Sequence, residues 1–382
     1  MLDVPDAMPE SQLYPYGSML LPTDPPDTDG MWRWRRLLPL DGTGVYPLQI
    51  GGTPLVTSAR LQTELGLPGL LLKDETRTPT GSNKDRATAL CLVDAARKGA
   101  TAIACASSGN VACSLAAGAA AMGLRAYIFV SARTVSPAKV AYMRAFGATV
   151  FLVDGPYEQA YRLCDDACAR LGWYNRNTAS NPLAMQAKKT VAFEVWESLG
   201  RRMPDVVYLP VGDGVTLAAF VHGCEELIRC GVEGRLPRIV GVQTAGAAPL
   251  VRAFEAGTDT WETVATSTIA DGIDVGDPYF GRQALAAVAK TGGSWRAVSD
   301  DDLRAAMALM ARTSGILAEP AGAAALAGVM ADRDTLGETD QRIVALVSGT
   351  GLKDQRWLPS AGGKAFEIPP TLDALECALV DA

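Results

Sequence analysis

The stretch PTGSNKDR, residues 79–86, places Lys84 between a turn and the start of a helix. Its Pro-Thr-Gly-Ser part is typical of a turn, whereas Asp85 and Arg86 open a segment whose apolar residues share one helical face. A lysine at such a junction is partly buried, which removes water from its amine and lowers its pKa, as a Schiff-base lysine requires. The alternative is a lysine that ties down a helix end, and this stretch alone leaves both interpretations open.

Around this stretch, short β-branched runs alternate with helical segments. Strands are predicted at residues 102–106, 126–130, 149–153, 206–210, 239–243 and 343–347. Helices are predicted at residues 110–122, 137–146, 157–171, 215–228, 301–313 and 320–330. This alternation predicts an α/β fold with parallel sheets that helices cover on both faces. It does not choose among the many α/β families.

Length and composition are those of a globular enzyme. The chain has 382 residues, 48% of them hydrophobic and 20% charged, and a formal net charge of −7. An acidic chain without an evident basic face makes nucleic acid an unsuitable partner. No segment reaches the roughly 18 uncharged apolar residues that would span a membrane. Residues 1–10 have neither a basic nor an apolar part of a secretory signal, so we expect a cytoplasmic protein with no membrane partner.

Histidine and cysteine usage excludes several chemistries. His222 is the single histidine, which argues against a Ser-His-Asp triad and against a multi-histidine metal centre. The eight cysteines are scattered without a CxxC pair, so we expect reduced, mostly buried thiols and no metal site. Acid–base work at neutral pH therefore falls to lysine, a carboxylate, tyrosine or a cofactor.

Three further loops come between a strand and the segment that follows it, which is the usual ligand edge of such sheets. They are residues 106–110 (ASSGN), 210–216 (PVGDGVT) and 347–354 (VSGTGLKD). Small hydroxyls and backbone N–H groups in the first loop form a cradle for a carboxylate, although the same residues also cap helices. Glycines in the second let the backbone approach a phosphate at a helix N-terminus, with a plain glycine turn as the alternative. There, Asp213 should point away from the phosphate.

Taken in order, five motifs of this chain resemble those of threonine synthases. They are PTGSNKDR, SSGN, the glycine loop after PDVVYLPVG, EPAGAAALAG from Glu319 onward, and SGTGLKD. Threonine synthases are pyridoxal-phosphate enzymes of the tryptophan-synthase-β-like fold, called fold type II. The resemblance runs from Gly51 to Asp354, and the ADGI stretch at residues 270–273 is similar to one in serine/threonine dehydratases.

The resemblance implies roles for individual residues. Lys84 is expected to bind pyridoxal 5'-phosphate as a Schiff base and later to transfer the substrate proton. The substrate carboxylate is expected at Ser107, Ser108, Gly109 and Asn110, with Asn110 also reaching the cofactor's phenolic oxygen. The cofactor phosphate is expected at Gly212, Asp213, Gly214, Val215 and Thr216. Ser348 is expected against the pyridine nitrogen, where a hydroxyl favours elimination and replacement over transamination.

It also implies a domain organisation and an assembly. Residues 1–44 are expected to form an arm that packs on the body or on a second subunit. Within them, residues 32–36 (WRWRR) are alternatively a basic and aromatic surface patch. Residues 45–86 and 183–382 are expected to form a large cofactor-binding domain. Residues 87–182 are expected as a smaller inserted domain that carries the carboxylate-binding loop. Family analogy implies a homodimer.

One segment departs from the family pattern N-S-x-N-P-x-R-x-x-G-Q-K-T, whose Asn, Ser and Arg bind the phosphate of O-phosphohomoserine. The matching residues 178–190 place Ala179 at the Ser position and Ala184 at the Arg position. We therefore expect β/γ-elimination or replacement on another amino acid that carries a leaving group. A true threonine synthase with Arg176 or Lys188 as substitute cation is one alternative, and a catalytically silent pyridoxal-phosphate or partner-binding protein is the other.

Overall fold

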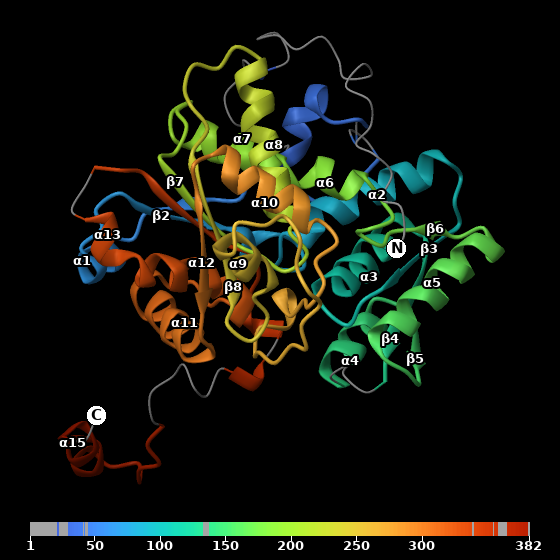
Figure 1. The fold of residues 1–382 in the computed structure, drawn as a ribbon. Coiled ribbons are helices and arrows are strands. Elements are labelled where there is room, and N and C mark those ends of the chain that lie inside the picture. The colour runs from blue at the N-terminus through green and yellow to red at the C-terminus, as the bar shows by residue number, and fades with distance from the viewer. Residues whose placement is uncertain are drawn as a thin grey trace.

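A computed structural model shows two separate sheets, each with helices on both faces (Figure 1). It describes residues 21–22, 30–40, 42, 45–132, 137–337, 340–353, 355–357 and 365–380. Both sheets are parallel apart from one edge pair. The predicted α/β class with parallel, doubly covered sheets is therefore confirmed.

The larger sheet has six strands in the order β1-β2-β10-β7-β8-β9. These are β1 (Leu55–Val56), β2 (Leu70–Asp74), β10 (Ile343–Val347), β7 (Val206–Pro210), β8 (Arg238–Thr244) and β9 (Ser294–Val298). The central strands β7 and β10 are buried along their whole length, which explains their continuous apolar sequences. The edge strand β1 runs antiparallel to β2.

Helices cover this sheet in two layers, each with its own apolar core. One layer contains α1 (Ala59–Leu65), α11 (Asp300–Ser314), α12 (Pro320–Ala331) and α13 (Arg333–Leu336). The other contains α7 (Thr190–Ser198), α8 (Val215–Arg229), α9 (Pro249–Glu255) and α10 (Gly281–Lys290). Because α12 is apolar on all sides, it is buried between the sheet and α11.

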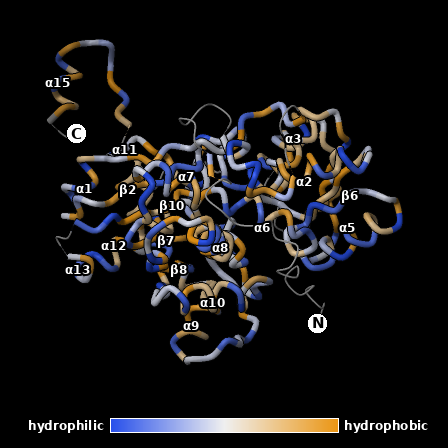
Figure 2. Tube along the Cα trace, turned by 90° about the horizontal axis from the view of Figure 1, so that it is seen from above, coloured by the Kyte–Doolittle hydropathy of each residue, from blue (hydrophilic) through white to orange (hydrophobic). Residues whose placement is uncertain are grey.

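The smaller sheet has four parallel strands in the order β5-β4-β3-β6. They are β5 (Thr149–Val153), β4 (Arg125–Ser131), β3 (Ala102–Ala106) and β6 (Tyr174–Asn175). The helices around it are α2 (Lys84–Arg97), α3 (Asn110–Met122), α4 (Pro137–Ala145) and α5 (Tyr157–Leu171), and α6 (Leu183–Lys188) packs on α2. Figure 2 shows long hydrophobic stretches in α2 and α3, whose buried side chains form the core beside β3.

Most predicted elements are present with ends that differ by one or two residues. Strands β3, β5, β7 and β10 and helices α3 and α5 have the predicted bounds. Helix α2 begins at Lys84 itself, one residue earlier than the sequence indicated, with Asn83 as its N-cap. The sequence did not predict the short strands β1, β2, β6 and β9. The boundaries expected for the arm and the two domains stay predictions.

The N-terminal segment is described in part, and its described part packs on the body. The 3-10 turn η3 (Gly30–Leu37) buries Trp34 completely, with its ring 5.0 Å from that of Phe193. Arg33 forms an ion pair of 2.8 Å with Glu197 of α7. The rest of the arm, residues 1–20, 23–29, 41 and 43–44, lies outside the described residues. The contacts of η3 favour an arm packed on the body over a surface patch.

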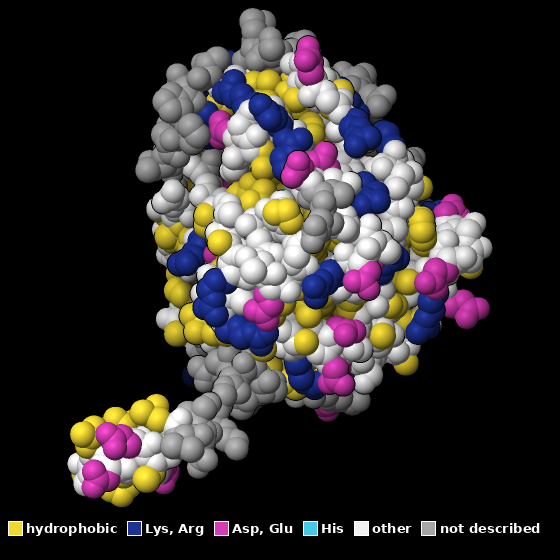
Figure 3. All heavy atoms as spheres, turned by 90° about the vertical axis from the view of Figure 1, so that its left-hand side faces the viewer, with side chains coloured by type: hydrophobic (Ala, Val, Ile, Leu, Met, Phe, Trp, Pro, Cys, Tyr) yellow, Lys and Arg dark blue, Asp and Glu magenta, His cyan; other side chains and the backbone are white. Residues whose placement is uncertain are grey.

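Helix α15 (Leu372–Val380) extends away from both sheets (Figure 1). On the face in Figure 3, basic and acidic side chains of the described residues are interspersed, so that face carries no continuous basic band. Within the described residues, no helix is long and apolar enough to cross a membrane. Seven of the eight cysteines are buried and Cys377 is exposed, which confirms the expectation of mostly buried thiols.

Candidate active site

The stretch that contains Lys84 is fixed to the loop after β10. The backbone N–H of Asn83 donates to the carbonyl oxygen of Ser348 at 3.0 Å, and Thr350 N–H donates to Gly81 at 2.8 Å. Gly81 has a φ of +69°, and a Cβ there would lie 2.5 Å from Thr350. Only glycine fits this turn. Two of the four predicted ligand loops therefore meet at Lys84.

The third loop reaches the same place through Asn110. Asn110 is the first residue of α3, and its side-chain amide donates to Glu319 Oε1 at 2.6 Å. The backbone N–H of Glu319 donates to Gly349 at 3.0 Å, beside Ser348. Ser107 Oγ accepts a hydrogen bond from Gly109 N–H, as in a turn that precedes a helix.

Glu319 is a site residue to which the sequence assigned no role. It precedes α12 in the EPAGAAALAG motif, which was the available signal. Burial raises the pKa of Glu319, while Lys353, Lys139 and Lys84 oppose this rise. The pocket beside it is lined by Gly109, Asn110, Lys139, Ile269, Asp271, Gly272, Glu319, Pro320 and Ala321. The ADGI stretch and the SSGN loop thus border one pocket.

The fourth loop, residues 212–216, leads into α8 and has the shape of an anion cradle. Gly214 has a φ of +89°, and a Cβ there would lie 2.7 Å from the carbonyl oxygen of Phe280. Helix α8 has 15 residues and no side-chain cap, so backbone N–H groups of its first turn are left for a ligand. Asp213 accepts a hydrogen bond from the backbone of Tyr279, and burial raises its pKa. These features fit a phosphate group.

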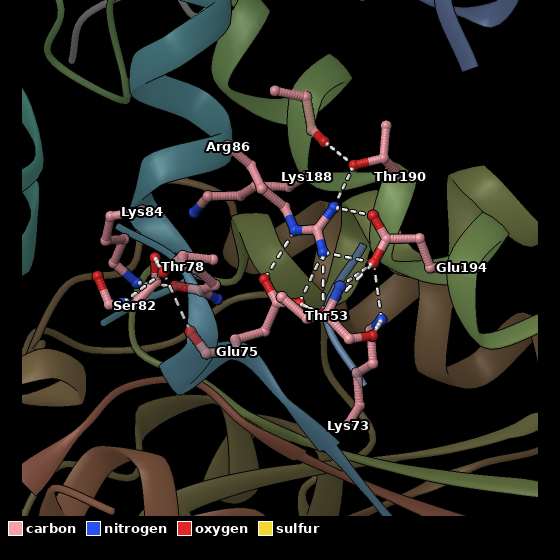
Figure 4. Close-up of polar contacts among 12 residues, drawn as sticks. Thr53, Lys73, Glu75, Thr78, Ser82, Lys84, Arg86, Lys188, Thr190 and Glu194 are labelled. Carbon is pink, nitrogen blue, oxygen red and sulfur yellow. Dashed lines mark hydrogen bonds and ion pairs between the residues drawn. The ribbon is translucent and has the colours of Figure 1, made fainter. Parts of the chain in front are cut away.

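A buried lysine completes this loop. Lys188, at the end of α6, is 3% exposed, and its amine donates to Thr216 Oγ1 at 3.2 Å. In Figure 4 its amine extends to the side on which Lys84 lies, away from the ion pairs of Arg86. Burial holds the pKa of Lys188 well below its usual range, and the charges of Lys84 and Arg176 add to this effect. A bound phosphate would reverse it by supplying negative charge.

Lys84 itself is half-buried and donates to Asn83 Oδ1 at 3.2 Å. Burial lowers its pKa, and this effect exceeds the opposing attraction of Glu319. Arg176 and Lys353 lower the pKa further. The amine therefore loses its proton more readily than a surface lysine, which is the property that attack on an aldehyde or abstraction of a proton requires.

Two residues along α2, Arg86 belongs to a network with both partners in place (Figure 4). Its guanidinium donates to Glu75 at 2.7 Å and to Glu194 at 2.6 Å. Lys73 forms a second ion pair with Glu194 at 2.7 Å, and Thr53 donates to Glu75. All of these residues are buried. This network holds the start of α2 against β2 and α7 and so fixes where Lys84 lies.

Arg176 follows β6 and is fully buried without a carboxylate partner. Its Nε donates to Thr88 Oγ1 at 3.2 Å and its Nη1 to Thr178 Oγ1 at 3.0 Å. Its Nη2 has no hydrogen-bond partner among the described residues. The two alanines of the departing segment lie elsewhere: Ala184 is completely buried in α6, and Ala179 packs on the apolar cluster around Tyr161.

Comparisons with known proteins agree with this geometry. Residues 46–349 match the family model described as "Pyridoxal-phosphate dependent enzyme". Threonine synthase from Methanosarcina acetivorans is 32% identical over 377 residues, covering 96% of this chain and 91% of that protein. Threonine synthase from Methanocaldococcus jannaschii is 35% identical over 343 residues, covering 89% and 84%.

Solved structures share the fold. Threonine deaminase from the organism abbreviated T.th. is 27% identical with a TM-score of 0.66, covering 82% of this chain and 94% of that one. The processed form of threonine deaminase isoform 2 from Solanum lycopersicum is 22% identical with a TM-score of 0.69, covering 81% and 82%. The fold is that of the fold type II enzymes. The chain therefore belongs to the pyridoxal-phosphate dependent enzymes, within which it is similar to threonine synthases.

Proposed function

We propose that the protein eliminates or replaces a leaving group on the β or γ carbon of an amino acid, as a pyridoxal-phosphate dependent lyase. The observation that carries this proposal is the position of Lys84. Its amine has a lowered pKa and lies where the loops at Asn110, Gly214 and Ser348 converge. Such convergence of a nucleophilic amine, a carboxylate cradle and a phosphate cradle suits this chemistry.

Residues on two sides of Lys84 would hold the cofactor. We assign Gly212, Asp213, Gly214, Val215 and Thr216 to its phosphate, with Lys188 as an additional cation. Asn110 is assigned to the phenolic oxygen, with Glu319 fixing the orientation of its amide. Ser348 is assigned to the pyridine nitrogen. When bound, the cofactor supplies an electron sink for the charge that develops at the substrate α carbon.

The chain's own groups then bind the substrate and move its proton. We assign the substrate carboxylate to Ser107, Ser108, Gly109 and Asn110, at the N-terminus of α3. Lys84 Nζ, neutral because burial lowers its pKa, takes the proton from the α carbon. A hydroxyl at Ser348, rather than a carboxylate, leaves the facing nitrogen unprotonated and so favours loss of a leaving group over transamination.

A second candidate is threonine synthase itself, since both relatives described above carry that name. Two observations favour it: Lys188 and Arg176 are buried, and their charges act on Lys84 or on each other. Against it stand Ala179 and Ala184, which lack the hydroxyl and guanidinium of the family pattern. A phosphate dianion without its bidentate arginine loses a charge-assisted contact worth about 2 kcal/mol. We therefore propose a substrate other than O-phosphohomoserine.

Borohydride reduction followed by peptide mapping tests the central assignment. The pyridoxyl group is expected on Lys84, and its recovery on Lys73, Lys188 or Lys189 would refute the assignment. An absorbance change on adding amino acids separates an enzyme from a silent binding protein. Location in the cytoplasm, assembly as a homodimer and the two-domain division stay predictions.

Product analysis tests the substrate. We expect turnover of O-phosphohomoserine to be slow beside the best of O-phosphoserine, O-acetylserine, serine and threonine. The double variant Ala179→Ser, Ala184→Arg is expected to raise it, because it restores the two phosphate contacts. Rapid threonine formation by the unaltered protein would instead establish the second candidate.

A further inference from the structure

Buried cations in this protein fall into two groups. Five lysine or arginine side chains are buried among the described residues: Lys73, Arg86, Arg176, Lys188 and Lys189. Lys73, Arg86 and Lys189 each form an ion pair with a carboxylate. Lys188 donates to a hydroxyl at the phosphate cradle. Arg176 is left, with no carboxylate and no phosphate cradle beside it.

The surroundings of Arg176 leave part of its binding capacity unused. The guanidinium stays charged at any physiological pH, so burial without an anion is costly. Its Nε and Nη1 donate to Thr88 and Thr178, and its Nη2 has no partner in the described part of the chain. Because Thr178 Oγ1 accepts from Nη1, its own hydroxyl hydrogen is available to an acceptor. One free nitrogen and one hydroxyl therefore present donors to an anion.

Neither the substrate α-carboxylate nor the cofactor phosphate accounts for this group. The SSGN loop is assigned to the former, and α8 with Lys188 to the latter. Arg176 is held by α2 and by the turn at residues 178–180, which begins the segment that departs from the family pattern. It still acts on Lys84, since its charge lowers the pKa of that amine. It is therefore near the reacting centre and on the side that remains for the substrate side chain.

We propose that Arg176 Nη2 and the Thr178 hydroxyl bind an anionic group on the side chain of the substrate, which makes the substrate an acidic amino acid or one with an anionic leaving group. The proposal rests on the proposed function and adds its substrate class. A single free guanidinium nitrogen suits a carboxylate better than a phosphate dianion, which favours a bidentate arginine. Because Nη2 is closed off from solvent in this structure, the turn at residues 178–180 must shift to admit the group.

Binding of matched ligands to the cofactor-loaded protein tests the proposal. L-2-aminoadipate and L-norleucine have the same chain length and differ in a terminal carboxylate, and absorbance titration gives a dissociation constant for each. The parent protein should prefer L-2-aminoadipate. Arg176→Gln should weaken its binding about tenfold to a hundredfold, as expected for a charge-assisted contact, and change that of L-norleucine less than about twofold. Arg125→Gln, at an exposed arginine of β4, is the matched control and should change neither.

Three results would overturn the proposal. The first is a parent protein with no preference for L-2-aminoadipate, and the second is an equal loss for both ligands in Arg176→Gln. The third is a lower affinity of Arg176→Gln for pyridoxal phosphate with unchanged ligand selectivity, which would assign Arg176 to the cofactor. Should Arg176→Gln not fold, Arg176→Lys carries the same test, with a smaller loss of selectivity. Selective binding without turnover of any amino acid would refute the proposed function and leave this subsite standing.

Discussion

Lys84 and Arg86 lie two residues apart on α2 in opposite electrostatic surroundings. Burial alone would lower the pKa of Arg86, but Glu194 and Glu75 together raise it above its ordinary value. At Lys84 burial also acts first, and there it exceeds the attraction of Glu319 and Asp213, so the pKa falls. Carboxylates in direct contact outweigh desolvation at Arg86, whereas more distant ones do not at Lys84.

The difference separates charges that the chain neutralises from charges that it leaves for ligands. Glu194 belongs to the first kind: burial would raise its pKa, yet Arg86 and Lys73 hold it below its usual range. Lys84, Lys188 and Arg176 belong to the second kind, since none forms an ion pair with a carboxylate in the described part of the chain. Substitutions in the first group should damage folding, and those in the second should damage binding.

Breaking the paired region should have the largest effect on stability. Arg86→Met leaves Glu75 and Glu194 buried without their shared cation, and it should lower the free energy of unfolding by about 3–5 kcal/mol. Urea denaturation of both proteins measures the difference. Arg312→Met is the control, because Arg312 and its partner Glu64 are 58% and 45% exposed and such pairs contribute about 0–1 kcal/mol. Equal losses in the two variants would contradict the distinction between the regions.

A second substitution tests the ligand side of the comparison. Gly214→Val forces a branched side chain onto a backbone with φ of +89° and against Phe280, so the cradle at α8 must open. We expect the dissociation constant for pyridoxal phosphate to rise at least about tenfold, measured by equilibrium titration of protein freed of cofactor. Gly172→Val is matched to it, with φ of +68° and no atom near its Cβ. That control should lose stability and keep its cofactor affinity.

The smallest effect has the opposite sign. Lys188→Met should stabilise the cofactor-free protein by about 1 kcal/mol near pH 7, because it removes an amine buried without a carboxylate. In the unfolded chain this lysine keeps its proton up to about pH 10.4, whereas burial lowers its pKa in the folded protein. Between those values the unfolded state binds more protons, so the stability of the parent rises with pH and the gain from Lys188→Met shrinks. Urea denaturation from pH 7 to pH 10 should show this trend, and a gain that grows with pH would contradict it.

Periodicity and turn residues predicted much of the fold. Strand β10 and helix α3 have continuous apolar sequences between clear turns, and their bounds are as predicted. Strand β2 was not predicted because it carries Lys73 and Asp74 at fully buried positions. The partner of Lys73 is Glu194, which is 121 residues away in the sequence, so no local pattern reveals that its charge is neutralised.

The site was predictable where loops follow strands, and less so where long-range contacts decide. The loops at Lys84, Asn110 and Gly214 could be placed at one edge from their positions after strands or before helices. Glu319 lies in a quoted motif, yet its role depends on a hydrogen bond to Asn110, 209 residues away. Whether Arg176 is buried beside Lys84 depends on Thr88, which the sequence does not link to it.

The strand order has a consequence for how the chain is synthesised. Strand β10, residues 343–347, pairs with both β2 and β7, although β7 leaves the ribosome well over a hundred residues earlier. The smaller sheet uses only residues 102–175 and can pair as soon as they emerge, whereas β2 and β7 wait with open edges. Ser348, which anchors the backbone beside Lys84, arrives with β10. A nascent chain halted before residue 343 should therefore be unable to retain the cofactor and should depend on chaperones to protect its unfinished sheet.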